Sequence, residues 1–261
     1  MTLVTDAAGH QRRVKRGWMN LRVDQIIHET PDTDTFVMTD AEEGGRVFDY
    51  IAGQYLTFRF DNVDAKPLVR SYTMSSSPCQ VPFCAVTVKR VDGGKISNWL
   101  CDHVKVGDVL RARGPIGKFV YDPAIDKKHL VMVAGGSGVT PFVSILREYA
   151  HHLGKDGAPE KMTLVVSHRS KTDIISAADL APLEKIKGVS IITTLSREKL
   201  TNEGFWHGRL DDDKLACALA GTYGHATYMS CGPKAIMDLT VSHLQKAGVP
   251  EGDIKLESFE S

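Results

Sequence analysis

The sequence predicts a two-domain protein, with an antiparallel β-barrel followed by an α/β domain built on an open parallel sheet. Two different patterns of secondary structure along the chain support this prediction. From Gly17 to about Asp122, short β-rich segments alternate with glycine and proline turns, whereas after about Ile125 strands alternate with helices. A length of 261 residues also suits two ordinary domains.

The first half contains six short strand-like segments, and this spacing is typical of an antiparallel barrel. We expect the barrel at residues 17–124, with one short helix near Ser97–His103. Residues 1–16 form a basic arm, expected to be a solvated tail, with Arg12, Arg13, Lys15 and Arg16. The expected strands are Met19–His28, Thr33–Thr39, Gln54–Phe60, Leu68–Met74, Phe83–Val91 and Asp108–Arg113.

The second domain is expected at residues 125–261, as a five-stranded parallel sheet with helical crossovers. Such sheets bind ligands beyond the carboxyl ends of their strands. Pro141 and Pro233 suit first helical turns, and Gly248 suits a helix end. The strands are expected at Leu130–Ala134, Thr163–Ser167, Ser190–Leu195, Ala226–Ser230 and Ile254–Leu256, and the helices at Pro141–Leu153, Ile174–Ile186, Asp211–Leu219 and Pro233–Ala247.

Charge, hydropathy and cysteine content exclude several classes of protein. Basic and acidic residues number 32 each, which disfavours a nucleic-acid partner. The longest apolar run, Leu130–Ala134, is far shorter than the roughly 20 residues of a membrane helix. Five scattered cysteines indicate reduced thiols and a cytoplasmic location. Cys79-x4-Cys84 lacks the following C-x2-C of an iron–sulfur pattern, so no metal site is expected.

Two segments of the first domain could bind a nucleotide-like ligand. In Arg70-Ser71-Tyr72-Thr73 an arginine fork suits a diphosphate, a tyrosine face suits a flat ring and a hydroxyl can bond a ring nitrogen. The same residues also make an ordinary β-strand. Gly93-Gly94-Lys95-Ile96-Ser97 precedes the short helix, where amides and the Ser97 hydroxyl could bind an anion. A glycine hairpin followed by an N-cap serine is the alternative.

Three segments follow strands of the parallel sheet, at its ligand-binding edge. The turn Gly135–Pro141 opens a helix and could cradle a pyrophosphate, or could simply be a tight turn. Cys231-Gly232-Pro233 places a thiol where a cofactor ring could lie, although a lone cysteine is more often a packing residue. Ser196-Arg197-Glu198 could offer an arginine to a phosphate or could be a solvated loop.

The order of these motifs is more specific than any one of them. Arg70-x-Tyr72-Thr73, Gly94–Ser97, Gly114–Gly117, Gly136-x-Gly138-x-x-Pro141 and Cys231–Pro233 follow one another along the chain. This series resembles the ferredoxin–NADP reductase superfamily from about Trp18 to Phe259. It is most similar to the reductase halves of bacterial oxygenase reductases, phenylacetyl-CoA-type reductases and hybrid-cluster-protein reductases. In the first group a [2Fe–2S] domain often shares the chain. The sequence ends where such a domain would begin, so we expect either a separate acceptor or a trimmed chain.

The resemblance implies roles for individual residues. Arg70 would bind the FAD diphosphate, Tyr72 would pack on the isoalloxazine, and Thr73 would hydrogen-bond near flavin N5. Cys231 would lie beside nicotinamide C4, and Glu257 with Phe259 near the flavin ring. The implied catalytic set is therefore Thr73, Cys231 and Glu257. The other implied cofactor-binding residues are Ser71, Val88, Lys89, Gly94, Lys95, Ile96, Ser97, Gly136, Ser137, Gly138, Thr140, Pro141, Arg169, Ser196, Arg197, Gly232 and Pro233.

The implied activity is hydride transfer from a nicotinamide nucleotide to FAD, followed by single-electron transfer to a ferredoxin or another iron–sulfur or oxygenase partner. NADPH is favoured, with NADH possible, because Val166-Ser167-His168-Arg169 lacks an acidic residue for a ribose hydroxyl, whereas Ser196-Arg197 suits a 2′-phosphate. Three alternatives stay open: a free-flavin, quinone or diaphorase-type reductase, an electron-transfer subunit of a larger complex, and a plain two-domain dehydrogenase.

Overall fold

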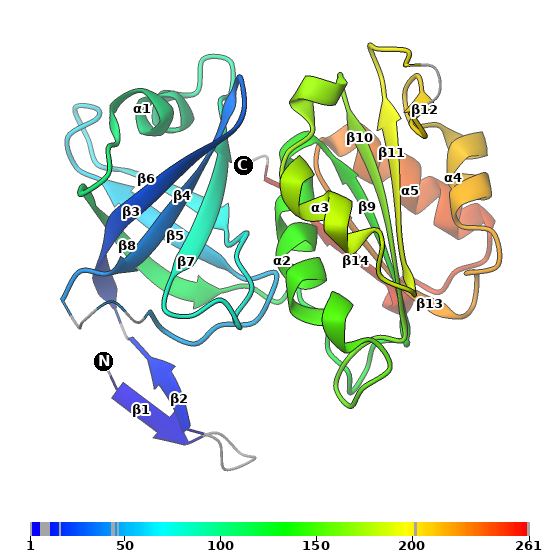
Figure 1. The fold of residues 1–261 in the computed structure, drawn as a ribbon, viewed down its shortest axis with the longest axis horizontal. Helices are drawn as coiled ribbons and strands as arrows, with labels where there is room; N and C mark the ends of the chain where they lie inside the picture. Colours follow the sequence, from blue (N-terminus) through cyan, green and yellow to red (C-terminus); the bar gives the residue numbers. More distant parts are fainter. Residues whose placement is uncertain are drawn as a thin grey trace. The chain divides into compact units, whose positions relative to one another are not determined.

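The computed structural model describes residues 2–5, 11–15, 17–42, 45, 47–200 and 203–259. The chain divides into two compact units, unit 1 at residues 1–120 and unit 2 at residues 121–261. Both halves of the predicted fold class are confirmed: unit 1 holds an antiparallel sheet and unit 2 a parallel sheet with helices (Figure 1). Within the described ranges, no helix combines the length and the apolar character needed to cross a membrane.

Unit 1 is an antiparallel barrel with strand order β6-β5-β8-β3-β4-β7. A bridge between Met74 and Val86 joins the two ends of this order, β6 and β7. Its elements are β3 Trp18–Thr30, β4 Thr33–Asp40, β5 Tyr55–Phe60, β6 Leu68–Thr73, β7 Cys84–Lys89, α1 Lys95–His103 and β8 Val109–Ile116.

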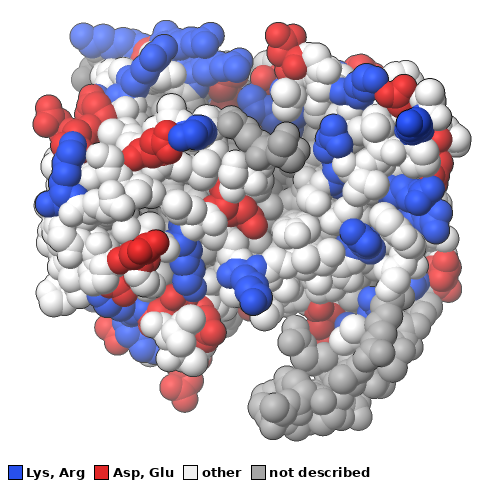
Figure 2. Space-filling model, turned by 180° about the vertical axis from the view of Figure 1, so that it is seen from behind, with Lys and Arg blue, Asp and Glu red and all other residues white. Residues whose placement is uncertain are grey.

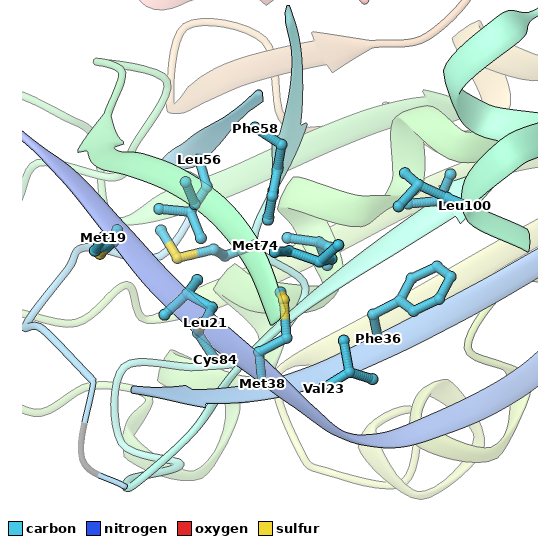
Figure 3. Close-up of a cluster of buried hydrophobic side chains, with 14 of the residues drawn as sticks. Met19, Leu21, Val23, Phe36, Met38, Leu56, Phe58, Met74, Cys84 and Leu100 are labelled. Carbon is cyan, nitrogen blue, oxygen red and sulfur yellow. The ribbon is translucent and has the colours of Figure 1, made fainter. Parts of the chain in front are cut away.

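The strands of unit 1 bury apolar side chains around a common core. Leu21, Met38 and Leu56 come from three different strands and are fully buried, and Figure 3 shows them converging with Met74 and Cys84. Burying one such leucine contributes about 1.5–3 kcal/mol relative to leaving it exposed. The barrel core is therefore formed jointly by side chains from several strands.

The basic arm differs from the prediction of a solvated tail. Residues Thr2–Thr5 (β1) and Gln11–Val14 (β2) pair as a two-stranded antiparallel sheet. The Arg13 amide donates to Asp49 Oδ2 at 2.8 Å, and Lys15 Nζ lies 3.2 Å from carboxylate oxygens of Asp40 and Glu42. Two acidic partners thus hold Lys15 against the barrel. The Arg12 side chain and Arg16 lie outside the described residues.

Unit 2 is a parallel sheet in the order β12-β11-β10-β9-β13-β14. Figure 1 shows α2 and α3 on one face of this sheet and α4 and α5 on the other. Its elements are β9 His129–Gly135, α2 Thr140–Tyr149, β10 Lys161–His168, α3 Ala177–Leu183, β11 Val189–Leu195, β12 Trp206–His207, α4 Asp212–Ala218, β13 Ala226–Cys231, α5 Lys234–Lys246 and β14 Ile254–Glu257.

The sequence expectations for unit 2 need three corrections. The sheet has six strands rather than five, because Trp206–His207 pairs with Thr194–Leu195 as a short edge strand. Helix α3 is shorter than the predicted Ile174–Ile186, since Ser176 adopts a left-handed conformation before it. Pro233 caps α5 rather than starting it. The expected role of Gly248 is confirmed, because its amide donates to the Gln245 carbonyl at a φ of 75°.

Candidate functional site

In unit 1, strand β6 carries three of the predicted site residues. Arg70 is exposed, and among the described residues its guanidinium donates only to the Val69 carbonyl, at 2.8 Å. Tyr72 is partly buried beside Phe58, with ring centroids 6.1 Å apart, and burial raises the pKa of its hydroxyl. Thr73 is buried at the end of the strand. The segment therefore presents a free cation, a neutral aromatic ring and a hydroxyl in sequence.

Ser71 and Val88 differ from Arg70, Tyr72 and Thr73 in the atoms that they offer to a ligand. Ser71 is exposed, and its hydroxyl lies 3.0 Å from the Thr57 hydroxyl on β5. The Val88 side chain is fully buried in the barrel core, which leaves only its backbone available to a ligand. Lys89 is held by an ion pair with Asp32.

The second predicted binding segment of unit 1 lies at the start of α1. The helix begins at Lys95, two residues earlier than expected, so Ser97 lies in its first turn rather than at the N-cap. The N-cap is Gly94, where an added Cβ would lie 2.6 Å from Ser97 Oγ and 3.0 Å from the Val91 carbonyl oxygen. Ser97 Oγ instead accepts from the Val91 amide at 3.2 Å. The first-turn amides of Lys95, Ile96 and Ser97 therefore remain available for an anion.

Lys95 itself is exposed and forms an ion pair with Asp64. The hydrogen bond that the Lys95 ammonium donates to Asp64 lowers the pKa of the Asp64 carboxyl. Exposed pairs of this kind are screened by solvent and contribute little to stability. The ammonium is thus free to exchange its partner for a phosphate at little cost.

In unit 2 the predicted residues gather where the strand order of the sheet reverses. From β9 the chain proceeds to β10 and β11 on one side, and later to β13 and β14 on the other. The turn Gly136–Val139 follows β9, and Cys231-Gly232-Pro233 ends its neighbour β13. In open α/β sheets, ligands bind outside the carboxyl ends of the strands at this switch point.

The two turns pack backbone against backbone. A Cβ on Gly138 would lie 2.2 Å from the Cys231 carbonyl oxygen, and one on Gly232 would lie 2.8 Å from the Gly135 carbonyl oxygen. Real Cβ atoms essentially never approach other atoms so closely, so both positions require glycine. Thr140 completes the turn by donating its hydroxyl to the Ser137 carbonyl at 2.7 Å. Pro141 follows as the second residue of α2.

Cys231 and Glu257 are register partners at the ends of β13 and β14. Burial, reinforced by the Glu257 carboxylate, raises the pKa of the Cys231 thiol, which stays protonated at neutral pH. Burial likewise raises the pKa of Glu257 to about 7. Its Oε2 atom is buried with no hydrogen-bond partner among the described residues. A buried acceptor without a partner is costly and therefore indicates a site that a ligand completes. Phe259 is exposed two residues further on.

The carboxyl ends of β10 and β11 form a cationic edge. The amides of Ser196 and Arg197 donate to the carbonyls of His168 and Arg169 at 2.8 Å, so the two loops run side by side. Both Arg169 and Arg197 are exposed. Figure 2 shows Lys and Arg side chains gathered at the upper left, over the end of unit 2 where β12 lies.

Lys171 is a neighbour of this edge that the sequence did not single out. Its amide donates to Glu198 Oε2 at 2.6 Å and its ammonium lies 2.5 Å from Glu203 Oε2. Both carboxylates near Arg197 are thereby engaged by Lys171, and no ion pair of Arg197 occurs among the described residues. Glu198 and Glu203 contact Lys171 from another loop, so no local pattern in the sequence indicates this arrangement.

Two family models match the chain. Residues 20–121 match the oxidoreductase FAD-binding domain, and residues 132–242 match the oxidoreductase NAD-binding domain. The chain is 38% identical to the glycine betaine monooxygenase reductase subunit of Chromohalobacter salexigens over 93% of this chain and 64% of that protein. It is 31% identical to the ferredoxin reductase component of 3-ketosteroid-9-alpha-monooxygenase from Rhodococcus rhodochrous, over 92% of this chain and 65% of that one. The chain thus spans just under two thirds of the length of these relatives.

The fold is shared with a solved ferredoxin NADP+ reductase from Neisseria gonorrhoeae with bound FAD and NADP. The TM-score is 0.78 at 21% identity, covering 94% of this chain and all of that chain. The two family models follow each other in the same order as the barrel and the parallel sheet. This chain is an oxidoreductase that belongs to the family combining this FAD-binding domain with this NAD-binding domain, and it has the fold of ferredoxin–NADP reductases.

Proposed function

We propose that this chain takes a hydride from NADPH onto bound FAD and passes single electrons to a separate ferredoxin or other iron–sulfur partner. One observation carries the proposal. The glycine turn after β9, the Cys231 turn after β13 and the Glu257 carboxyl after β14 all lie at one carboxyl edge of the sheet. The relatives named as monooxygenase reductase components support the type of acceptor. Free thiols at all five cysteines favour a reducing, cytoplasmic location.

The groups carried by β6 and the start of α1 in unit 1 fit FAD. The Arg70 guanidinium is free to bind the diphosphate, and the α1 amides with Lys95 provide a second anion site. Tyr72 offers its ring to the flavin and Thr73 its hydroxyl to N5. Ser71, Gly94 and the backbone of Val88 with Lys89 complete the set that we assign to FAD. When bound, FAD accepts two electrons as a hydride and releases them singly.

The edge of unit 2 fits the nicotinamide nucleotide. We assign the pyrophosphate to the turn Gly136-Ser137-Gly138 with Thr140 and Pro141, and the nicotinamide to Cys231 with Gly232 and Pro233. Because the Cys231 thiol stays protonated, its role is to position the ring rather than to attack it. We assign to Glu257 and Phe259 the polarisation and shielding of the reacting rings.

The cationic edge favours NADPH over NADH. Arg197 with Ser196 and Arg169 would bind the 2′-phosphate, and a charge-assisted arginine bond contributes roughly 1.5–3 kcal/mol. This is on the order of 10- to 100-fold in affinity. Lys171 supports the preference because it engages Glu198 and Glu203, which would otherwise neutralise Arg197.

An anaerobic titration of the purified protein tests the proposal. Flavin released by heat should chromatograph as FAD, and NADPH should bleach the bound flavin with one equivalent per chain. Addition of an oxidised ferredoxin should then restore the colour. Release of FMN would contradict the assignment of Arg70 and α1, and a flavin that NADPH and NADH both fail to bleach would refute the hydride step.

The nucleotide preference has its own matched pair of variants. Arg197→Ala should lower kcat/KM for NADPH by about 10- to 100-fold and leave the NADH value unchanged. Lys187→Ala removes the same charge from the exposed residue before the amino end of β11 and should change neither value. An equal loss of kcat/KM with both nucleotides in Arg197→Ala would show that Arg197 does not bind the 2′-phosphate.

A further inference from the structure

The two loops that follow β10 and β11 in unit 2 carry three carboxylates, and each of these has a partner. Asp173 accepts a hydrogen bond from the Ser170 hydroxyl at 2.6 Å. Glu198 accepts from the backbone amide of Lys171, also at 2.6 Å. Glu203 Oε2 lies 2.5 Å from the Lys171 ammonium. Lys171 therefore engages two carboxylates of the neighbouring loop, through two different groups.

The two contacts of Lys171 depend on its side chain to different degrees. Any residue except proline at position 171 supplies the amide that binds Glu198. Glu203 is held by the ammonium, and no other hydrogen bond or ion pair of Glu203 occurs in the described part of the chain. Loss of the lysine charge therefore releases Glu203 and leaves Glu198 bound. The Lys171 and Glu203 side chains are 55% and 42% exposed, so a released Glu203 is free to move.

Arg197 lies beside this arrangement because the backbone links the two loops. The Arg197 amide donates to the Arg169 carbonyl at 2.8 Å, and the next residue, Glu198, reaches the Lys171 amide. The Arg197 side chain is exposed and forms no ion pair within the described ranges. A Glu203 carboxylate released from Lys171 thus has an unpaired guanidinium within the adjoining loop. Guanidinium groups bind carboxylates and phosphates through the same paired, charge-assisted hydrogen bonds.

We propose that Lys171 is a positioning residue for nucleotide specificity, which holds Glu203 away from Arg197 and so keeps Arg197 available to the 2′-phosphate. The inference rests on the proposed function, which assigns the 2′-phosphate of NADPH to Arg197. Glu203 is then an internal competitor of that phosphate, and Lys171 keeps it engaged elsewhere. Glu198 is not such a competitor, because a backbone amide binds it whatever the side chain at position 171. The effect concerns the 2′-phosphate alone, so NADH is indifferent to it.

Binding of nucleotide fragments to the FAD-loaded protein tests this role without turnover. Calorimetric titration with 2′,5′-ADP measures recognition of the 2′-phosphate, and 5′-AMP is the matched ligand that lacks it. In Lys171→Ala, the Kd for 2′,5′-ADP should rise about 3- to 5-fold, the extent to which an exposed carboxylate competes for an arginine. The Kd for 5′-AMP should stay unchanged. The KM for NADPH should rise by the same factor with kcat unchanged, and Lys171→Arg should behave as wild type.

Rescue by a second substitution identifies the carboxylate involved. Lys171→Ala combined with Glu203→Gln should bind 2′,5′-ADP as tightly as wild type, whereas Glu203→Gln alone should change little. Glu198→Gln should change the affinity by the same factor with Lys171 present or absent, since independent sites act additively. Lys246→Ala is the matched control, because Lys246 also forms an exposed ion pair in unit 2, with Asp212 at 3.7 Å. This variant should retain wild-type affinity for both ligands.

The outcomes separate the role of Lys171 from the proposed function. If the wild-type protein binds 2′,5′-ADP no more tightly than 5′-AMP, the assignment of the 2′-phosphate to Arg197 falls, and the role of Lys171 with it. If the wild type distinguishes the two ligands but Lys171→Ala binds both as wild type does, only the role of Lys171 is overturned. A loss that Glu203→Gln does not restore would overturn it too, by showing that the ammonium binds the phosphate directly. Equal weakening of both ligands in Lys171→Ala would likewise contradict it.

Discussion

Gly138→Ala tests the packing of the two turns at the switch point. The added Cβ would lie 2.2 Å from the Cys231 carbonyl oxygen, 2.5 Å from its carbonyl carbon and 2.6 Å from Gly232 Cα. The first distance is about 1.2 Å less than ordinary van der Waals contact. All three atoms belong to backbone, so no side chain can rotate away. Overpacking typically lowers the free energy of unfolding by about 1–3 kcal/mol. Because the clash is with backbone, we expect a loss of about 3 kcal/mol for Gly138→Ala.

Calorimetry and hydrogen exchange measure this effect. A loss of about 3 kcal/mol corresponds to a fall in the Tm of unit 2 by roughly 6–12 °C, at about 2–4 °C per kcal/mol. Exchange followed by mass spectrometry should show faster exchange in peptides of β9 and β13 and unchanged exchange in unit 1. Gly252→Ala is the control, because a Cβ there meets nothing within 4 Å and its φ is not positive. A Gly138→Ala protein within 0.5 kcal/mol of wild type would refute the reasoning.

Two further substitutions concern the edge of unit 2. Burial raises the pKa of Glu257 from its ordinary 4.5 to about 7. As the pH rises from 4.5 to about 7, ionisation of Glu257 therefore lowers the free energy of unfolding more and more, and above pH 7 this loss stays constant. Glu257→Gln should therefore gain stability over wild type between pH 5 and pH 8, by about 1–2 kcal/mol because the side chain is partly exposed; denaturant midpoints that differ equally at both pH values would contradict this. Cys231→Ala should slow flavin reduction by NADPH about 10-fold or more through misplacement of the ring, with FAD content unchanged. Exposed Cys217→Ala should behave as wild type, and loss of FAD or of folding in Cys231→Ala would instead identify a core residue.

The strands of both units could be predicted because their patterns are local. A short segment rich in β-branched and aromatic residues such as Thr33–Asp40, or a continuous apolar run such as Leu130–Ala134, is enough to identify a strand. The edge strand Trp206–His207 has only two residues, and its pairing with β11 comes from the tertiary fold. The start of α1 was misplaced for a related reason. The sequence favours Ser97 as a cap, but its hydroxyl bonds the Val91 amide and Gly94 caps the helix.

The candidate site could be predicted only where a motif is continuous in sequence. Arg70–Thr73 and Cys231–Pro233 are such motifs. The contact between the hydroxyl groups of Thr35 and Thr87 is not, since these residues are 52 residues apart and meet only because β4 pairs with β7 in the sheet. The same holds for Lys171, whose partner Glu203 follows 32 residues later. Contacts of this kind have no periodicity or spacing that a single sequence displays.

The contact between the turns at Gly138 and Gly232 has a consequence for how tightly a nucleotide can bind. Loops that order around a ligand lose conformational entropy at binding, and this loss subtracts from affinity. Here the two turns already fix each other through backbone atoms that no rotamer change can separate. Their ordering is completed when unit 2 folds. At the nucleotide site that we propose, the ligand therefore meets a preorganised surface, and we attribute its affinity to the contacts it makes there rather than to any rearrangement of these turns.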